Sequence, residues 1–176
     1  MNSASGGSTV IAGGRLNEAT GTAAAVCGGS SNLASGLQSS VTGGSGNTAS
    51  GERASVSGGE DNSASGDYAA MGGGRTNVAS GNHATVWGGE GNESFAHRAS
   101  VLAGVNNTAG DSAGTRADGE YAAIVSGNNN IARGDRAAVL GGNENLASGQ
   151  DATVCGGDQN GAIGTQSTVL GGRQNA

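Results

Sequence analysis

The chain has 176 residues, of which 37 are glycine and none is proline, and its net charge is −6. Apolar residues make up only 34%, and the aromatic residues are one Trp, two Tyr and one Phe, which is too few for a single thick globular core. All eight basic residues are scattered arginines, which disfavours a nucleic-acid partner, and no apolar run approaches the ~20 residues of a membrane span.

A fifteen-residue repeat organises the chain, and a clear copy is G-G-x-x-N-x-A-S-G at residues 58–66. We number each repeat from the first glycine of the pair. Repeats then begin at residues 13, 28, 43, 58, 73, 88, 103, 126, 141 and 156, with partial copies over residues 1–12 and 171–176. Glycine-rich chains are often disordered, but a strict period of this length is typical of a solenoid, and glycine does not recur at every third residue as in collagen.

Each repeat predicts two short strands separated by two turns. Positions 12 and 14 alternate with positions 13 and 15 as in a strand, and the small position 7 predicts a second strand. The Gly pair and the Gly at position 9 lie between them, where tight turns need positive φ or close backbone approach. One repeat is therefore one coil, with like strands of successive coils paired in parallel. The predicted interior is thin because position 7 is Ala, position 12 is small and position 14 is a branched aliphatic in all copies but that of Met71.

An asparagine occupies position 5 in every copy of the repeat. Asparagine tolerates left-handed backbone and can bond its own backbone or the asparagine of the next coil. We therefore expect a stacked asparagine ladder at one turn. Within the complete repeats, its members are Asn17, Asn32, Asn47, Asn62, Asn77, Asn92, Asn107, Asn130, Asn145 and Asn160.

The outward face of the position-14 strand indicates a packing interface. Position 13 is small in nearly every copy, while position 15 carries large apolar residues in the second half of the chain. A thin solenoid with such a face has reason to associate with copies of itself. The predicted interface residues are Trp87, Leu102, Val125, Leu140 and Leu170.

The repeat is irregular between Ser94 and Glu120. The copy that begins at residue 103 has twenty-three residues, so eight extra residues enter within 108–120 and must leave the solenoid as a loop. Loops of this kind often carry function, although long surface insertions are also tolerated without any role. The candidate ligand-binding residues of this zone are Phe95, His97, Asp111, Arg116, Asp118 and Tyr121.

No catalytic, metal or cofactor site is predicted. The two histidines, His83 and His97, have no recurring acidic partner, and a zinc site needs three or four converging ligands. Cys27 and Cys155 are eight coils apart, roughly 40 Å at ~4.8 Å per coil, so they cannot form a disulfide within one chain. A solenoid hydrolase would need a paired Asp/Glu cleft, which the chain lacks. We therefore expect the protein not to be an enzyme.

Other repeat families fit the pattern poorly. Calcium-binding nonapeptide repeats need an Asp in each nine-residue unit, hexapeptide helices need a bulky aliphatic in each unit, and pentapeptide repeats need a large apolar residue in each pentad. By contrast, residues 54–66 (ASVSGGEDNSASG) and 152–160 (ATVCGGDQN) resemble YadA-type head repeats of trimeric autotransporter adhesins of Gram-negative bacteria. The family repeat usually has fourteen residues, whereas this one has fifteen, a Gly pair and an invariant Asn.

The resemblance covers residues 1–176 as a single head domain and implies its architecture and function. It implies an all-β, left-handed parallel β-roll of about eleven coils, assembled as a side-by-side homotrimer. The neck, stalk and membrane anchor would lie outside this sequence, so the chain looks like a fragment of a longer protein and does not itself insert into a membrane. The implied function is adhesion at the bacterial surface, where the missing C-terminal regions anchor the head to the outer membrane. The partners would be a host cell-surface or extracellular-matrix protein or a glycan.

The alternative to an adhesin head is a monomeric β-solenoid that binds ice or a glycan through a flat face.

Overall fold

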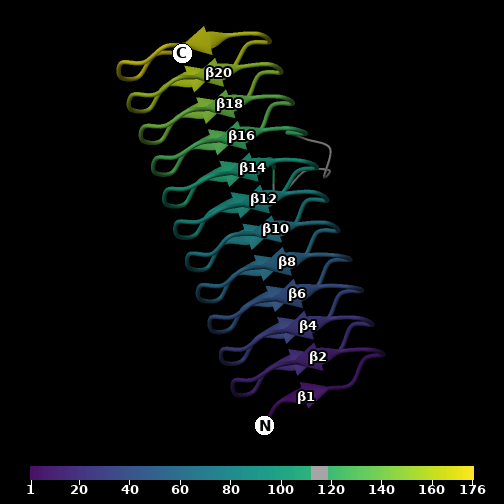
Figure 1. Ribbon diagram of the computed structural model, residues 1–176. Coiled ribbons are helices and arrows are strands. Elements are labelled where there is room, and N and C mark those ends of the chain that lie inside the picture. The colour runs from purple at the N-terminus through teal and green to yellow at the C-terminus, as the bar shows by residue number, and fades with distance from the viewer. Residues whose placement is uncertain (112–118) are drawn as a thin grey trace.

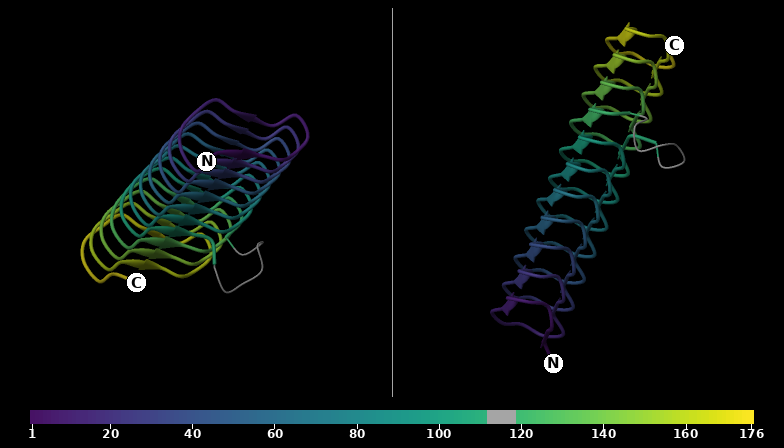
Figure 2. Two further views of the ribbon diagram at one scale, coloured as in Figure 1. Left: turned by 90° about the horizontal axis from the view of Figure 1, so that it is seen from below. Right: turned by 90° about the vertical axis from the view of Figure 1, so that its right-hand side faces the viewer.

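The computed structural model describes residues 1–111 and 119–176, and in these residues every regular element is a strand. The strands form two parallel sheets of eleven strands each, and every coil contributes one strand to each sheet (Figure 1). The coils stack from the N-terminus to the C-terminus as a flattened tube (Figure 2). This confirms the predicted all-β parallel solenoid of about eleven coils. The described residues include no helix that could cross a membrane.

All twenty-two strands are two residues long. The odd sheet contains the strands at repeat positions 6 and 7, namely β1 (Ser3–Ala4), β3 (Glu18–Ala19), β5 (Leu33–Ala34), β7 (Thr48–Ala49), β9 (Ser63–Ala64), β11 (Val78–Ala79), β13 (Glu93–Ser94), β15 (Thr108–Ala109), β17 (Ile131–Ala132), β19 (Leu146–Ala147) and β21 (Gly161–Ala162). The even sheet contains those at positions 13 and 14, namely β2 (Val10–Ile11), β4 (Ala25–Val26), β6 (Ser40–Val41), β8 (Ser55–Val56), β10 (Ala70–Met71), β12 (Thr85–Val86), β14 (Ser100–Val101), β16 (Ala123–Ile124), β18 (Ala138–Val139), β20 (Thr153–Val154) and β22 (Thr168–Val169).

Strand register follows the repeat. Ala64 pairs with Ala79 and Val86 pairs with Val101, each fifteen residues further along the chain. Parallel pairing in this register places equivalent residues of successive coils about 4.8 Å apart. Across the long coil, Ser100 pairs with Ala123, twenty-three residues away, so the sheet continues without a change of register. Every repeat position therefore becomes a straight column along the solenoid.

The interior is as thin as the sequence predicts. Its largest fully buried side chains are Met71, Ile124 and the valines of position 14, which face the alanines of position 7 across the coil. Position 12 adds a second row of small buried residues, and positions 13 and 15 point outward. Because the side chains are so small, backbone hydrogen bonds between coils hold much of the structure together. The N–H of Thr85, for example, donates to the carbonyl of Ala99 at 3.0 Å.

The asparagines form a continuous buried ladder. The backbone N–H of Asn62 donates to Oδ1 of Asn47 at 3.0 Å, and Nδ2 of Asn62 donates to the carbonyls of Gly58 at 3.1 Å and Gly74 at 2.9 Å. Each asparagine therefore links three successive coils, the preceding one through its backbone N–H and its own and the next through its side chain. From Asn17 to Asn160 all ten are at most 1% exposed, so a polar residue is tolerated because every hydrogen-bonding group has a partner.

The left-handed backbone residues are not the asparagines of position 5. Positive φ falls on the second glycine of the pair, such as Gly59 at 92°, and on non-glycine residues at positions 4 and 11, such as His83 at 60°. The glycine at position 9 is needed for a different reason, since a Cβ added to Gly66 would lie 2.0 Å from the carbonyl oxygen of Gly81. Coil-to-coil hydrogen bonds at the turns, including His83 N–H to the carbonyl of Asp67 at 2.8 Å, set these angles.

The insertion leaves the solenoid at the turn that contains position 11. Thr108 and Ala109 remain in β15, and Ala122 N–H donates to the carbonyl of Gly119 at 2.9 Å, as Ala84 does to Gly81 at 3.0 Å. The eight extra residues are therefore 111–118, a narrower range than the sequence indicated. Arg116 and Asp118 lie outside the described residues.

Candidate functional site

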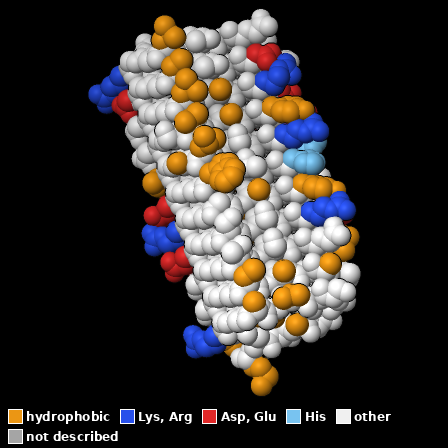
Figure 3. Space-filling model, in the orientation of Figure 1, with side chains coloured by type: hydrophobic (Ala, Val, Ile, Leu, Met, Phe, Trp, Pro, Cys, Tyr) orange, Lys and Arg blue, Asp and Glu red, His pale blue; other side chains and the backbone are white. Residues whose placement is uncertain are grey.

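The outward face of the even sheet carries an apolar stripe, defined as Trp87, Leu102, Val125, Leu140, Cys155 and Leu170. These residues occupy position 15 of six successive coils, so parallel register places them in one column. The exposed fraction ranges from 41% for Val125 to 79% for Leu170 among the five large side chains. Figure 3 shows hydrophobic side chains running along this face. Position 13 beside the stripe holds Thr85, Ser100, Ala123, Ala138, Thr153 and Thr168, which are small enough to let another surface approach.

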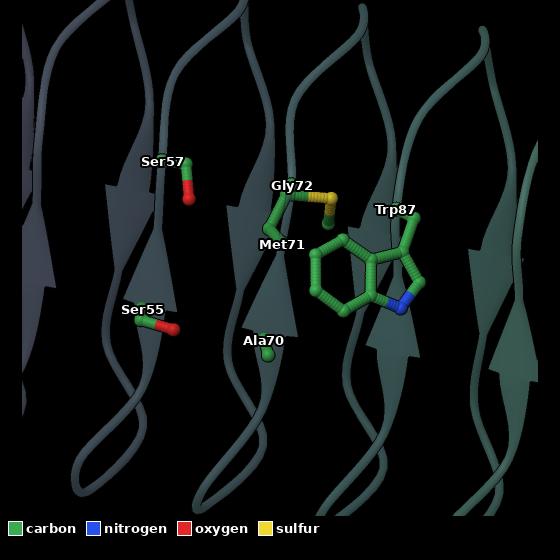
Figure 4. A pocket seen from close by; sticks show the side chains of 6 residues that line it. All are labelled: Ser55, Ser57, Ala70, Met71, Gly72 and Trp87. Carbon is green, nitrogen blue, oxygen red and sulfur yellow. The ribbon is translucent and has the colours of Figure 1, made fainter.

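The stripe begins at the middle coil, where Trp87 lies beside a shallow hollow. The indole ring extends toward Gly72 of the preceding coil (Figure 4), and its Cε3 would lie 3.1 Å from a Cβ placed on Gly72. Ser55, Ser57, Ala70 and Met71 complete the lining of a hollow of about 90 Å³. Trp87 remains 66% exposed, so the hollow supports one side of the ring and leaves most of it to solvent. The single chain does not bury this aromatic residue.

A second surface runs along one edge of the solenoid. We call it the edge row, defined as Gln38, Arg53, Tyr68, His83, Arg98, Tyr121 and Arg136. These side chains occupy position 11 of seven successive coils. Figure 3 shows, along one edge of the view, a column in which basic, hydrophobic and histidine side chains follow one another. The edge row lies beside the turn from which residues 111–118 depart.

Neighbouring side chains of the edge row stack on one another. The rings of Tyr68 and His83 are parallel within 7° with centroids 4.8 Å apart, which matches the coil spacing. The guanidinium of Arg53 lies 5.3 Å from the ring centre of Tyr68, and that of Arg98 lies 5.3 Å from the ring centre of Tyr121. Both arginines also donate to the hydroxyl of the tyrosine that they cover. The stacking fixes side chains that would otherwise be free to move.

The adjacent position-10 column is rich in carboxylates that pair with the arginines. Nη1 of Arg53 lies 3.0 Å from Oε1 of Glu52, and Nη1 of Arg98 lies 3.6 Å from Oε1 of Glu120. Arg136 binds Asp151 of the next coil through two hydrogen bonds, from Nε at 2.6 Å and from Nη2 at 2.9 Å. These bonds lower the pKa of Asp151 below its ordinary range and raise that of Arg136. The edge therefore presents charged groups but no uncompensated positive field.

The structure brings together two of the predicted ligand-binding residues, His97 and Tyr121. Tyr121 N–H donates to the carbonyl of His97 at 3.1 Å, and Nδ1 of His97 lies 3.2 Å from Oε1 of Glu120. The imidazole of His97 is 5.7 Å from that of His83, so the two histidines are neighbours at this edge. Phe95 directly follows β13 and is half-buried, and Asp111 lies where the insertion begins.

Sequence reasoning missed most of the edge row, including Arg53, Tyr68 and Arg98. The signal was present, because reading position 11 down the aligned repeats gives Gln, Arg, Tyr, His, Arg, Tyr and Arg without a break. What the sequence did not reveal is that these residues share a left-handed backbone and stack on one another.

The left-handed backbone makes this row energetically unusual. The six edge-row residues Arg53, Tyr68, His83, Arg98, Tyr121 and Arg136 have φ values between 54° and 60°. A left-handed conformation costs an L-residue about 1 kcal/mol or more, whereas exposed ring and cation–π contacts return about 0.5–1 kcal/mol each. The ring and cation–π contacts therefore offset much of the backbone cost where planar side chains occupy these positions.

Within residues 1–111 and 119–176, no group of three or more His, Cys, Asp or Glu side chains is placed to hold a metal ion. Both cysteines are free thiols, Cys27 exposed and Cys155 half-buried. The candidate functional sites are the apolar stripe and the edge row. Comparison of the chain with models of known protein families and with curated protein sequences finds no match.

Proposed function

We propose that the chain is the head of a surface adhesin that assembles as a side-by-side homotrimer of left-handed β-rolls. The repeat strings at residues 54–66 and 152–160 supply the resemblance to trimeric autotransporter heads. The parallel solenoid of about eleven coils is the framework that such a head requires. On this reading, regions outside this sequence anchor the head to the outer membrane of a Gram-negative cell.

The observation that carries the proposal is the apolar stripe. Trp87, Leu102 and Leu140 stay 45–66% exposed in the single chain although they follow one another in a straight column. A contiguous apolar surface of this kind marks an interaction site in soluble proteins. Three copies arranged around an axis would bury the stripes against one another. They would also compensate for an interior whose largest side chains are mostly valines.

Trimerisation explains adhesion through avidity. Three identical chains present the same weak contact three times, and the second and third contacts form at high effective concentration. The binding groups then lie on the surfaces that the stripe leaves free, at the irregular zone around His97 and Tyr121. The partner is a host cell-surface protein, an extracellular-matrix protein or a glycan, and the mechanism needs neither a cofactor nor catalysis.

The oligomeric state tests this proposal. Sedimentation equilibrium at micromolar concentration should give three times the molar mass of one chain. Leu140→Asp, which places a charge in the stripe, should give a folded monomer, while Thr42→Asp in the N-terminal half of the same column serves as its control. A wild-type chain that sediments as a monomer contradicts the trimer.

Deleting residues 111–118 tests the irregular zone. The deletion restores a fifteen-residue coil and retains β15, so the trimer should persist while binding to host cells falls. Unchanged cell binding would show that the insertion is not part of the adhesive surface.

A monomeric solenoid that binds ice or a glycan through its flat face is the second candidate. Thr85, Thr153 and Thr168 at position 13 lie on the regular outward face of the even sheet, as ice-binding threonines do. Alanine and serine interrupt the row, which weakens this reading. A monomer that produces thermal hysteresis would favour it over the adhesin.

A further inference from the structure

We propose that the edge row is a binding surface for a linear, uncharged, hydroxyl-rich polysaccharide that lies along the solenoid axis. The inference deepens the proposed adhesive function by assigning the ligand class and the surface that holds it. It rests on the row's residue composition, its stacking and its charge balance.

Residue choice in the two left-handed columns is the first step. At position 4, on the opposite turn, five of eleven residues are of the types that adopt this backbone most easily: Gly46, Asp61, Gly91, Asn106 and Asn129. Position 11 contains two residues of such types in eleven copies, His83 and Asp151, and places Arg, Tyr or His in six successive coils. Six successive coils thus place planar, hydrogen-bonding side chains in one column, and this composition points to the edge row as a contact surface.

Preorganisation is the second step. Tyr68 is held between the guanidinium of Arg53 and the ring of His83, and Arg98 covers Tyr121. Yet Tyr68 is 43% exposed and Tyr121 is 48% exposed, so ring edges and hydroxyls still face solvent. A ligand that meets these groups does not have to immobilise free side chains, which lowers the entropic penalty of binding.

Charge balance selects the ligand class. Arg53, Arg98 and Arg136 each have a carboxylate partner within 4 Å. Acidic groups along positions 10 and 11 outnumber the arginines, and the whole chain carries −6. Binding of a polyanion depends on unpaired basic groups, so sulfated glycans, nucleic acids and anionic lipids fit this edge poorly.

Hydroxyl groups suit the same edge well. Paired guanidinium groups keep unused N–H donors, while Glu52, Asp67, Glu120 and Asp135 supply acceptors beside them. A sugar hydroxyl both donates and accepts, so it can bond to either column. Because positions 10 and 11 recur about every 4.8 Å, a linear polysaccharide along the axis would meet side chains of these two columns at each coil.

Affinity electrophoresis of the full chain provides the test. The probes are mixed-linkage β-glucan and galactomannan as neutral polysaccharides, heparin as a polyanion and gelatin as a protein. We expect retardation by at least one neutral polysaccharide, and a loss of at least about tenfold in affinity in the Tyr68→Ala/Tyr121→Ala double variant. Alanine is compatible with this backbone, since Ala23 occupies the same repeat position with φ of 57°. Circular dichroism verifies the fold.

The matched control is Asn129→Ala/Gln159→Ala, which alters two left-handed residues at the opposite edge and should leave retardation unchanged. Retardation by heparin or gelatin alone, by no probe, or equally by wild type and the tyrosine variant would overturn the inference. Cell adhesion by a trimer whose tyrosine variant adheres equally well would overturn it while leaving the adhesin proposal intact. A monomer that binds polysaccharide through the tyrosines would support the inference while contradicting the trimeric adhesin proposal.

Discussion

The backbone N–H of Asn77 donates to Oδ1 of Asn62 at 3.0 Å, and the N–H of Asn92 donates to Oδ1 of Asn77 at 2.9 Å. Nδ2 of Asn77 also donates to the carbonyls of Gly73 and Gly89, both at 3.0 Å. One buried side chain thus completes backbone hydrogen bonding in its own coil and in the next, while its backbone N–H is bonded by the asparagine of the preceding coil. A solenoid with so little apolar volume depends on such contacts, because they stabilise each coil against the next.

Asn77→Ala should therefore be strongly destabilising. It leaves the N–H of Asn92 and the carbonyl of Gly73 without their partner, and each such group costs about 1–3 kcal/mol. The carbonyl of Gly89 keeps its bond from the N–H of Arg75 at 2.9 Å. We expect the free energy of unfolding to fall by about 2–6 kcal/mol in urea denaturation. Asn128→Ala is the control, since its exposed side chain donates only to Asn143, and it should change stability by less than about 0.5 kcal/mol. Equal losses in the free energy of unfolding for Asn77→Ala and Asn128→Ala would show that burial of the asparagine ladder does not determine its contribution to stability.

Val139 and Leu140 are neighbours with opposite orientations, and aspartate should separate their roles. Val139 is fully buried, so Val139→Asp introduces an unpaired charge into a dry interior and should prevent folding. Leu140 is 47% exposed, so Leu140→Asp should keep the melting temperature of the single chain while it disrupts self-association. Circular dichroism and sedimentation measure the two effects. A folded Val139→Asp variant with an unchanged melting temperature would reverse the inward and outward assignment.

Ser94 is the one serine at a position that the other copies fill with alanine, and its hydroxyl is buried without a hydrogen-bond partner among the described residues. Removing an unsatisfied buried hydroxyl relieves a desolvation penalty, so Ser94→Ala should stabilise the chain by about 1 kcal/mol. Ser65→Ala, at an exposed position of the odd sheet edge, is the control and should be neutral. A destabilised Ser94→Ala chain would show that the hydroxyl has a bonding role.

The pair of Arg136 and Asp151 predicts a pH dependence confined to acid. The hydrogen bonds from Arg136 lower the pKa of the Asp151 carboxyl below 3.8. A carboxyl with a depressed folded-state pKa contributes stability that is present above its unfolded-state pKa and is lost as the pH falls through the folded-state value. NMR titration should find the Asp151 midpoint below 3.8, and Arg136→Gln should move it upward, whereas Arg75→Gln should not. A midpoint that ignores Arg136→Gln would show that the pair does not form in solution.

The repeat by itself determined the solenoid, its thin interior and the inward orientation of positions 7, 12 and 14, because side-chain size alternates with strand periodicity in copy after copy. It also predicted that the position-5 asparagines stack. It correctly placed left-handed backbone in the glycine pair, but it did not place any at positions 4 and 11, where the structure puts it on residues such as Arg53, Tyr68 and His83 rather than on the position-5 asparagines. Turn angles here follow from hydrogen bonds to the neighbouring coils, which override the preference of the individual residue.

Only the tertiary structure brought Tyr68 onto His83, and Arg98 onto Tyr121 across the long coil. In sequence these pairs are fifteen and twenty-three residues apart, and the second spacing departs from the repeat. Because the strands pair in parallel and in register, both pairs of side chains lie about one strand spacing apart. The insertion does not change this, since the strands before and after it keep the register of the sheet. The sequence therefore specified the scaffold, while the stacking of coils decided which side chains meet on its edge.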